Sequence, residues 1–521
     1  MYRKGVLPSG KPLPVAIQGD VSVPGTTYAC ASCHNRSGLS VMDETQRLPS
    51  INGPTLFQTL YPIFSGLSAS EREELPARYQ APPLRPAYTD ATLSKVIREG
   101  IDPKGRSLKP TMPRYALSDR DMTTLINYLK NLSSRPSPGV TDTSLALATV
   151  VTEDVSQGDQ DAMFNSLEKM VRIHNAIGNS PGDMRRMVTM QVMYLAFRSY
   201  TLSRWALKGS PNTWRAQLET LYDKNPVFAL VGGISNSSWK PIHEFCEDHQ
   251  IPCILPITDL PEVSKSDYYT MYFSNGYSQE GEAVARHLSR QSDLMRSGKV
   301  VQILGSDPAA KALAAGFQNA WTVAGGRPVK SVNVAKGQTI TGDWLSRQVP
   351  AAKDSVLLLW TGPESYDALR SIATAPNRPA SVFLSSSVLA ERLWDMPSEA
   401  RPFTYVSYLF REPGEKKLPP RMSRPRSITL NKEYRKNDHR IPSRTDTAAA
   451  VLNDALTRVE RNFYRDYLLD VIDAMEVQDT SDYELLNFGP GRRYLSEGCY
   501  IMRLSDGPNP TLTRMNEWDE Q

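Results

Sequence analysis

The length and charge of the chain exclude several classes of protein. With 521 residues it is too long for one hydrophobic core, so two or three domains are expected. The net charge of +4 is too small to indicate nucleic-acid binding. Apolar residues make up 40% of the chain, as in ordinary globular proteins. No stretch of 18 apolar residues is present, so the sequence predicts no membrane span.

The most specific motif lies near the N-terminus and reads Cys30-Ala31-Ser32-Cys33-His34. In the pattern C-x-x-C-H, two thiols can form thioether bonds to a porphyrin and the histidine can bind its iron. A redox C-x-x-C or half of a zinc site are the alternatives. The adjoining histidine, and the lack of a second cysteine pair with zinc spacing, disfavour both. The motif therefore predicts one covalent haem c.

A second axial ligand for the iron is expected at Met112. It stands between Pro110 and Pro113, and prolines stiffen a loop. A thioether presented on a stiff loop suits the sixth position of an electron-carrying haem. Met122 is the rival candidate, but it falls in the apolar stripe of a helix expected to begin after Ser118, which favours a core position.

Together these features resemble a class I cytochrome c over residues 1–132. The resemblance implies an all-α domain in which the carbonyl of Pro49 accepts a hydrogen bond from the ring of His34. Such a bond would orient the ring and tune the iron potential; an ordinary loop proline is the alternative. The resemblance also implies the periplasm of a Gram-negative bacterium. The first residues lack the apolar segment of a signal peptide, so we expect that one has been removed.

A linker is expected at residues 133–143, which are rich in Pro, Ser and Thr and show no apolar periodicity. Its prolines make it semi-stiff, so the first domain should stay near the next one. Beyond it stand three further cysteines, Cys246, Cys253 and Cys499. For the first two, a disulfide and buried thiols both remain open.

Beyond the linker, predicted strands alternate with predicted helices. Strands are expected at 145–152, 227–233, 251–257, 299–304, 329–334, 356–360 and 380–384, and helices at 160–177, 239–249, 280–294, 309–324 and 365–373. This alternation predicts βαβ units and parallel sheets. Two such blocks in series predict two α/β lobes.

The order of these elements, with segments such as Leu230–Ser238 and Ile251–Thr258, resembles a type I periplasmic binding protein of the kind that serves branched-chain amino acid and amide ABC transporters. The resemblance covers residues 144–521 and implies a ligand between the lobes, at the carboxyl ends of the strands. The candidate ligand-binding residues are Ser235, Ser237, Ser238, Thr258, Trp360, Thr361, Ser385 and Ser386. Helix caps and turns are the alternative role for such residues.

The chemistry of the ligand is less clear from the sequence. Many relatives carry an acidic residue after the last strand of the second lobe, to bind the ammonium group of an amino acid. Here Leu384 is followed by three serines, and Glu364 is only a candidate substitute. A neutral or anionic small molecule is therefore at least as plausible as an α-amino acid.

Basic residues are concentrated between Lys416 and Arg444. A solvated loop is the simplest interpretation of such a run. A docking surface for an acidic redox partner is the alternative, because opposite charge accelerates encounter.

The sequence thus predicts a multi-domain chain, in which an all-α mono-haem cytochrome c domain precedes a two-lobed α/β binding domain. The main functional prediction is electron transfer between a periplasmic dehydrogenase and the respiratory chain, where an oxidase-side cytochrome could be the other redox partner. The second domain would then bind a small molecule or a partner. The alternative is a solute-binding or sensor protein of the ABC-transporter type, whose haem reports redox state. No nucleophile–base pair or carboxylate pair can be placed, so no enzyme activity and no nucleic-acid partner are predicted.

Overall fold

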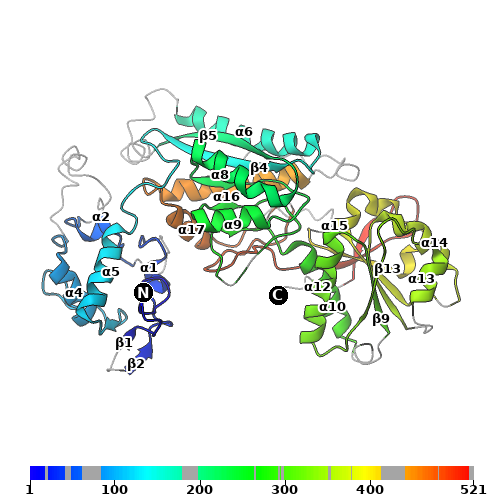
Figure 1. The fold of residues 1–521 in the computed structure, drawn as a ribbon, viewed down its shortest axis with the longest axis horizontal. Coiled ribbons are helices and arrows are strands. Elements are labelled where there is room, and N and C mark those ends of the chain that lie inside the picture. Colours follow the sequence, from blue (N-terminus) through cyan, green and yellow to red (C-terminus); the bar gives the residue numbers. More distant parts are fainter. Residues whose placement is uncertain are drawn as a thin grey trace. The chain divides into compact units, whose positions relative to one another are not determined.

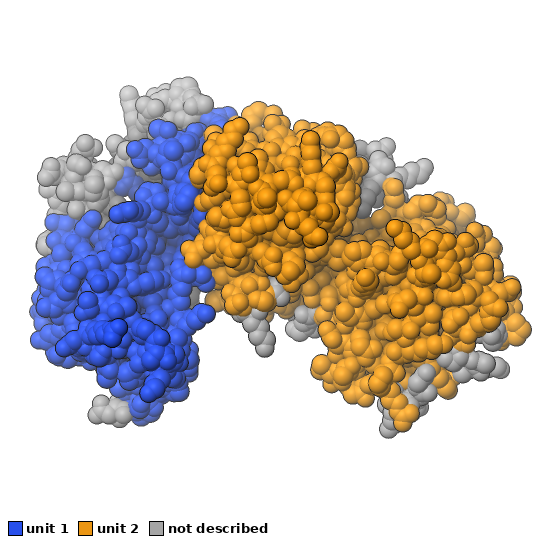
Figure 2. All heavy atoms as spheres, in the orientation of Figure 1, with its two compact units in different colours: residues 1–146, 175–200, 453–475 blue, residues 147–174, 201–452, 476–521 orange. Residues whose placement is uncertain are grey.

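The computed structural model describes residues 1–515 except 18–20, 41–47, 62–83, 179–196, 263, 265, 292–293, 295–298, 350–353, 377, 412–439, 479 and 481. The chain forms two compact units, which Figure 2 shows in blue and orange. Unit 1 contains residues 1–146, 175–200 and 453–475, and unit 2 contains residues 147–174, 201–452 and 476–521. The segment 453–475 thus belongs with the N-terminal part of the chain, although it is distant in sequence. Most of the basic run lies outside the described residues.

Unit 1 combines short helices with a small sheet. In its N-terminal segment the helices are α1 (Cys30–His34), α2 (Gly53–Leu56), α4 (Asp90–Glu99) and α5 (Asp119–Asn131). Its strands β1 (Pro14–Ile17), β2 (Val21–Pro24) and β3 (Arg114–Tyr115) form an antiparallel sheet in the order β2-β1-β3. The expectation of an all-α domain is therefore corrected, because extended segments before α1 and between α4 and α5 pair through their backbones.

Capping and amphipathic patterning define α4 and α5. The hydroxyl of Thr89 accepts a hydrogen bond from the N–H of Thr92, and α4 ends at Gly100, whose φ of 73° is in the left-handed region. Ser118 caps α5 in the same way, by accepting from the N–H of Asp121. The apolar faces of the two helices are buried in the core of unit 1 and consist of Leu93, Val96, Ile97, Met122, Leu125, Ile126 and Leu129. The core position predicted for Met122 is confirmed.

The first sheet of the α/β part has the order β5-β4-β6-β7-β8. Its strands are β4 (Ser144–Thr152), β5 (Ser199–Leu207), β6 (Ala229–Val231), β7 (Cys253–Ile254) and β8 (Thr270–Met271), and the run from β4 to β8 is parallel. The helices that belong to it are α6 (Gln157–Gly178), α8 (Trp214–Lys224) and α9 (Lys240–His249). We call this sheet and these helices lobe 1. The parallel arrangement was predicted, whereas β5, α8 and β8 were not. Cys246 and Cys253 are buried and are not joined by a disulfide.

The second sheet has the order β10-β9-β11-β12-β13-β14-β15. Its strands are β9 (Val300–Leu304), β10 (Lys330–Asn333), β11 (Val356–Trp360), β12 (Ser381–Ser385), β13 (Thr404–Tyr408), β14 (Tyr500–Leu504) and β15 (Leu512–Arg514). The first five strands in this order are parallel, and β14 and β15 add antiparallel edges. With α10 (Gly276–Ser289), α12 (Pro308–Val323), α13 (Gly342–Gln348), α14 (Tyr366–Ala373) and α15 (Ser386–Leu389), it forms lobe 2. The sequence predicted that the last strand ends at residue 384. The structure adds three later strands to this sheet, β13, β14 and β15.

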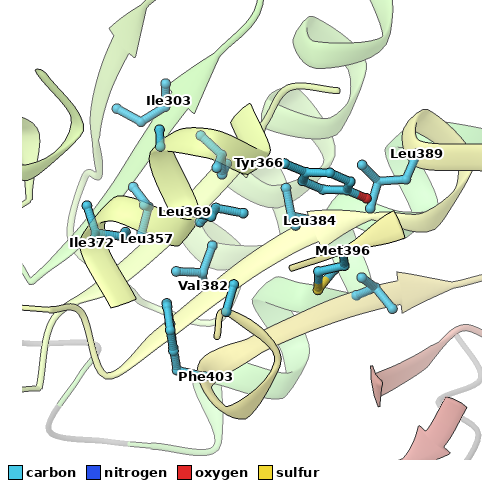
Figure 3. Close-up of a cluster of buried hydrophobic side chains, with 14 of the residues drawn as sticks. Ile303, Leu357, Tyr366, Leu369, Ile372, Val382, Leu384, Leu389, Met396 and Phe403 are labelled. Carbon is cyan, nitrogen blue, oxygen red and sulfur yellow. The ribbon is translucent and has the colours of Figure 1, made fainter. Parts of the chain in front are cut away.

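Helices bury both faces of the lobe 2 sheet (Figure 1). Leu357 and Leu359 of β11 pack in one cluster with Leu369 of α14, whereas Leu358, between them, packs in another with Phe317 of α12. This alternation follows from the two-residue period of a strand. Figure 3 shows the first cluster, in which side chains of β11, β12 and α14 interlock. Parallel strands buried on both faces are almost wholly apolar, so the polar groups of this lobe gather at the strand ends.

Two further helices complete the chain. Helix α16 (Arg440–Val459) begins in unit 2, and its residues from Asn453 onward are grouped with unit 1. Helix α17 (Arg465–Asp473) lies wholly in unit 1. Among the residues that the structure describes, no helix is long and apolar enough to cross a membrane.

The contact between α10 and α12 generates a stability prediction. A Cβ atom at Gly316 of α12 would lie 2.0 Å from the backbone oxygen of Ser278 in α10. Gly316→Ala should therefore push the helices apart and lower the free energy of unfolding of unit 2 by ~1–3 kcal/mol, as overpacking does. Chemical denaturation measures this effect. The control is Gly158→Ala in α6, where the nearest atom to a new Cβ is 3.9 Å away, so no loss of stability is expected. Equal effects of both substitutions would contradict the explanation.

Candidate functional site

The C-x-x-C-H motif forms α1 in unit 1. Cys30 is half-buried, Cys33 is exposed, and neither forms a disulfide. The imidazole of His34 is buried, and its Nδ1 lies 3.1 Å from the carbonyl oxygen of Pro49. The hydrogen bond expected between these two residues is thus present, and it leaves Nε2 available to a metal. Burial lowers the pKa of His34, which favours the neutral imidazole that binds iron.

Met112 lies in a loop of the same unit. Its side chain is half-buried and packs against the hydrophobic core, and the guanidinium of Arg114 donates hydrogen bonds to the carbonyls of Met112 and Leu108. Further half-buried apolar residues pack on this core, namely Tyr28, Ile51, Phe57, Tyr88 and Leu108. Two cysteines without a disulfide, an imidazole whose Nδ1 contacts the Pro49 carbonyl and an adjoining apolar core would suit a haem c, whose porphyrin would supply the other iron ligands. Among the described residues, no group of three His, Cys, Asp or Glu side chains could by itself hold a metal ion.

The candidate ligand residues of lobe 1 already have hydrogen-bond partners within the protein. The Ser237 hydroxyl donates to the carboxylate of Asp154 at 2.6 Å, and Ser235 Oγ accepts from the N–H of Ser237. Ser238 Oγ accepts from the N–H of Lys240 at the start of α9, and Thr258 Oγ1 accepts from the N–H of Leu260. These four residues lie at the carboxyl ends of the strands. The hydroxyls of Ser235, Ser238 and Thr258 accept within turns, and that of Ser237 is used by Asp154.

The candidates of lobe 2 fall into two groups. Trp360 is buried and donates its ring N–H to Gln302 at 3.1 Å, and Ser385 caps α15 by accepting from the N–H of Val388. Thr361 and Ser386 are also buried, each 1% exposed, but their hydroxyl oxygens have no hydrogen-bond partner. A buried hydroxyl without a partner is costly. These two side chains, at the ends of neighbouring parallel strands, are therefore the strongest candidates for contact with a ligand.

Glu364 does not supply the missing acid. It is exposed, and its carboxylate accepts a hydrogen bond from the N–H of Gly362 within the same turn, at 2.8 Å. Glu280 of α10 does lie at the strand ends, because Ser407, the neighbour of Ser385 in the sheet, donates to its Oε2 at 2.6 Å. The side chain is fully buried. Its other oxygen, Oε1, accepts no hydrogen bond of normal geometry, although the hydroxyls of Ser387 and Ser385 are near enough to stabilise the carboxylate.

The environment of Glu280 determines its charge. Burial raises its pKa to about 7, although the nearby hydroxyls of Ser387, Ser407 and Ser385 oppose this by stabilising the carboxylate. The carboxyl group is therefore balanced between its neutral and charged forms near neutral pH. Sequence reasoning missed Glu280 because it looked for an acid after the strand, whereas this acid reaches the strand end from a helix.

A buried arginine near the segments that connect the lobes was also missed. Arg444 of α16 is 5% exposed, and its Nε has no partner. Its guanidinium lies 3.9 Å from the carboxylate of Asp259 and 5.1 Å from the ring centre of Phe273. Phe273 in turn stacks on Tyr483 at 5.2 Å. The signal in the sequence was hidden, because Arg444 ends the basic run and looked like one more solvated charge.

Comparison with known proteins agrees with this architecture. Residues 207–423 match the family profile described as "Periplasmic binding protein". No curated protein is similar enough to count as a relative. The structure resembles an ABC transporter substrate-binding protein from Sphaerobacter thermophilus, with a TM-score of 0.52 and 14% identity over 72% of this chain and 98% of that one. It also resembles a branched chain amino acid ABC transporter protein from Thermus thermophilus with bound valine, with a TM-score of 0.52 and 11% identity over 73% and 97% of the two chains.

These identities are low, so the structural likeness concerns the fold. The fold is nevertheless specific, because two α/β lobes with parallel sheets follow each other and the match to the family profile spans parts of both. The α/β part of this chain therefore has the two-lobed fold of the type I periplasmic binding proteins.

Proposed function

We propose that the chain is a solute-binding protein of the ABC-transporter type, which acts outside the cytoplasm and binds a small molecule at the strand ends of lobe 2. The single observation that supports this most strongly is the group of buried polar atoms without partners, on Thr361, Ser386 and Glu280. Folding leaves such atoms unpaired only at a cost, and a bound ligand would recover it. A binding role requires no catalytic group, in agreement with the absence of a predicted enzyme activity.

The ligand is proposed to carry a protonated amino group. An ammonium group could donate to the unpaired oxygen of Glu280 and would balance its charge in a buried environment. The doubt that the sequence raised about α-amino acids rested on a missing acid, and Glu280 supplies one from a different element. The valine bound to the similar protein from Thermus thermophilus is compatible with this ligand class.

Thermal unfolding in the presence of the twenty L-amino acids tests the proposal. A true ligand should raise the melting temperature, because it binds only the folded chain. The matched carboxylic acid without the amino group should not raise it. Native mass spectrometry of the freshly purified protein would identify a ligand that is carried through purification. If neither experiment detects an amine, the ligand class is wrong.

Single substitutions should then locate the site. Ser386→Ala should weaken binding of the identified amino acid by ~1–3 kcal/mol, the usual cost of a lost buried hydrogen bond. Ser237→Ala is the matched control, because the Ser237 hydroxyl is already used by Asp154. Isothermal titration calorimetry measures both variants. A larger loss for Ser237→Ala than for Ser386→Ala would move the site to lobe 1.

Glu280 also predicts a pH dependence that needs no ligand. Its pKa is about 7 in the folded chain against an ordinary value of 4.5. Between these values the unfolded chain releases the proton that the folded chain keeps, so the free energy of unfolding should fall as pH rises. The expected fall is ~3 kcal/mol between about pH 4.5 and pH 7. Denaturation at several pH values should show a smaller fall for Glu280→Gln, and parallel curves would contradict the assignment.

We propose as a second function that unit 1 binds one haem c and transfers single electrons, with a dehydrogenase or an oxidase-side cytochrome as redox partner. The observation that favours it is the contact of His34 with Pro49, next to two cysteines in a C-x-x-C-H motif. The haem would supply one-electron chemistry, and His34 and Met112 would be its axial ligands. Mass spectrometry of the peptide that contains Cys30 and Cys33 tests covalent attachment.

The sixth ligand can be identified by spectroscopy. Met112→Ala should remove the weak thioether–iron band at the red end of the ferric spectrum, because no other sulfur takes its place. Met122→Leu should leave the band intact, since Met122 is a core residue and this substitution conserves its volume. Loss of the band in the Met122 variant alone would reverse the assignment.

A further inference from the structure

The segment that follows the C-x-x-C-H motif is held by a helix from the far end of the chain. The carboxylate of Asp470 in α17 accepts hydrogen bonds from two consecutive backbone amides, the N–H of Arg36 at 3.1 Å and the N–H of Ser37 at 2.8 Å. Each carboxylate oxygen takes one of them. Asp470 is 7% exposed and Ser37 is fully buried, so water competes little for these bonds.

Neighbouring residues of α17 extend this contact. Asp466, one turn before Asp470, pairs with Arg3 at 2.5 Å and with Arg36 at 3.4 Å. The hydroxyl of Tyr467 donates to the carbonyl of Ser40 at 3.2 Å. At the start of the helix, the N–H of Arg465 donates to Ser137 Oγ at 3.1 Å. Helix α17 therefore contacts residues 36–40 in three ways: two backbone amides bond to Asp470, Arg36 pairs with Asp466, and Tyr467 donates to the carbonyl of Ser40.

The geometry of the segment explains why it needs such support. Asn35 ends α1 with a φ of 60°, a conformation that few residues other than glycine adopt readily. The chain therefore turns sharply directly after His34, and the amides of the next two residues have no partner within α1. Tyr2 stabilises the turn from the other side, because its hydroxyl donates to the carbonyl of Asn35 at 2.8 Å.

We propose that α17 is an internal docking surface for residues 35–40, and that Asp470 is the residue that positions this segment behind His34. Pro49 contacts the imidazole of His34. Asp470 holds the turn that comes directly after His34 in the backbone. The N-terminal domain is then completed by a helix whose sequence lies between β13 and β14 of lobe 2, and its first 132 residues do not form an independent module. Hydrogen bonds from backbone N–H groups to a carboxylate are charge-assisted. The two bonds to Asp470 are therefore expected to be the strongest contacts between α17 and this segment.

Hydrogen–deuterium exchange on the full-length chain tests the docking without any haem. In Asp470→Ala, peptides that contain Arg36 and Ser37 should exchange about tenfold faster or more, as expected when a charge-assisted bond is lost. Asp470→Asn keeps one acceptor oxygen and should give an intermediate rate. The control is Asp119→Ala, which removes an exposed ion pair with Arg98 in the same unit. Unchanged exchange at residues 35–40, or equal acceleration throughout unit 1, would overturn the proposal.

A second measurement separates positioning from mere stability, and this part rests on the proposed haem binding. In the haem-loaded chain, Asp470→Asn should change the reduction potential, because it loosens the backbone that follows His34, the proposed iron ligand. Asp119→Asn should leave the potential unchanged. If no haem is found, the exchange experiment still decides the docking, so the two proposals can fail separately. Faster exchange with an unchanged potential would overturn the positioning role and leave only a structural contact.

Discussion

Burial of both faces of the parallel sheets is the constraint on which the α/β part of the structure depends. In β11, alternate leucines enter two different helix-covered clusters, so no face of the strand remains for polar chemistry. Within these strands a polar side chain must be paired, as Gln302 of β9 is with Trp360, so most polar side chains stand at the ends of the strands. Thr361, Ser385 and Ser386 all lie there, directly after apolar strands. The candidate site is thus a consequence of how the sheet is covered, and the ligand chemistry depends on which polar groups other elements bring to that edge.

Two charged side chains illustrate how those other elements contribute. Glu280 reaches the edge from α10, and its carboxyl group is neutral or charged according to small changes in its surroundings, because burial and serine hydroxyls act in opposite directions on its pKa. Arg444 is placed by α16 against Asp259 and Phe273. Leaving a buried charge with an unused donor or acceptor is expensive, and proteins tolerate it mainly where a ligand or a conformational change uses it. The same reasoning connects the stability and binding predictions, since both depend on Glu280.

Unit 1 depends on a different kind of constraint, the sharp turn after His34. A short helix of five residues cannot satisfy the amides that follow it, and the partner that does so is a carboxylate distant in the sequence. The N-terminal segment, whose motif resembles that of a small cytochrome, therefore shares one compact unit with residues 453–475. This arrangement also gives the residues 133–143 a different character from a free linker, because the N–H of Ser137 donates to the carbonyl of Phe463 and its hydroxyl accepts from Arg465.

The sequence by itself determined what local chemistry can determine. The C-x-x-C-H motif, the helix after Ser118, and the alternation of strands and helices are visible because turn chemistry and apolar periodicity act over a few residues. The pairing of β14 with β13, the bond of Ser237 to Asp154, the acid at Glu280 and the contact of Asp470 with the amides of Arg36 and Ser37 were decided only by the tertiary structure. Each of these joins residues that are far apart in the chain, and no local pattern encodes which distant group will satisfy a buried amide, hydroxyl or carboxylate.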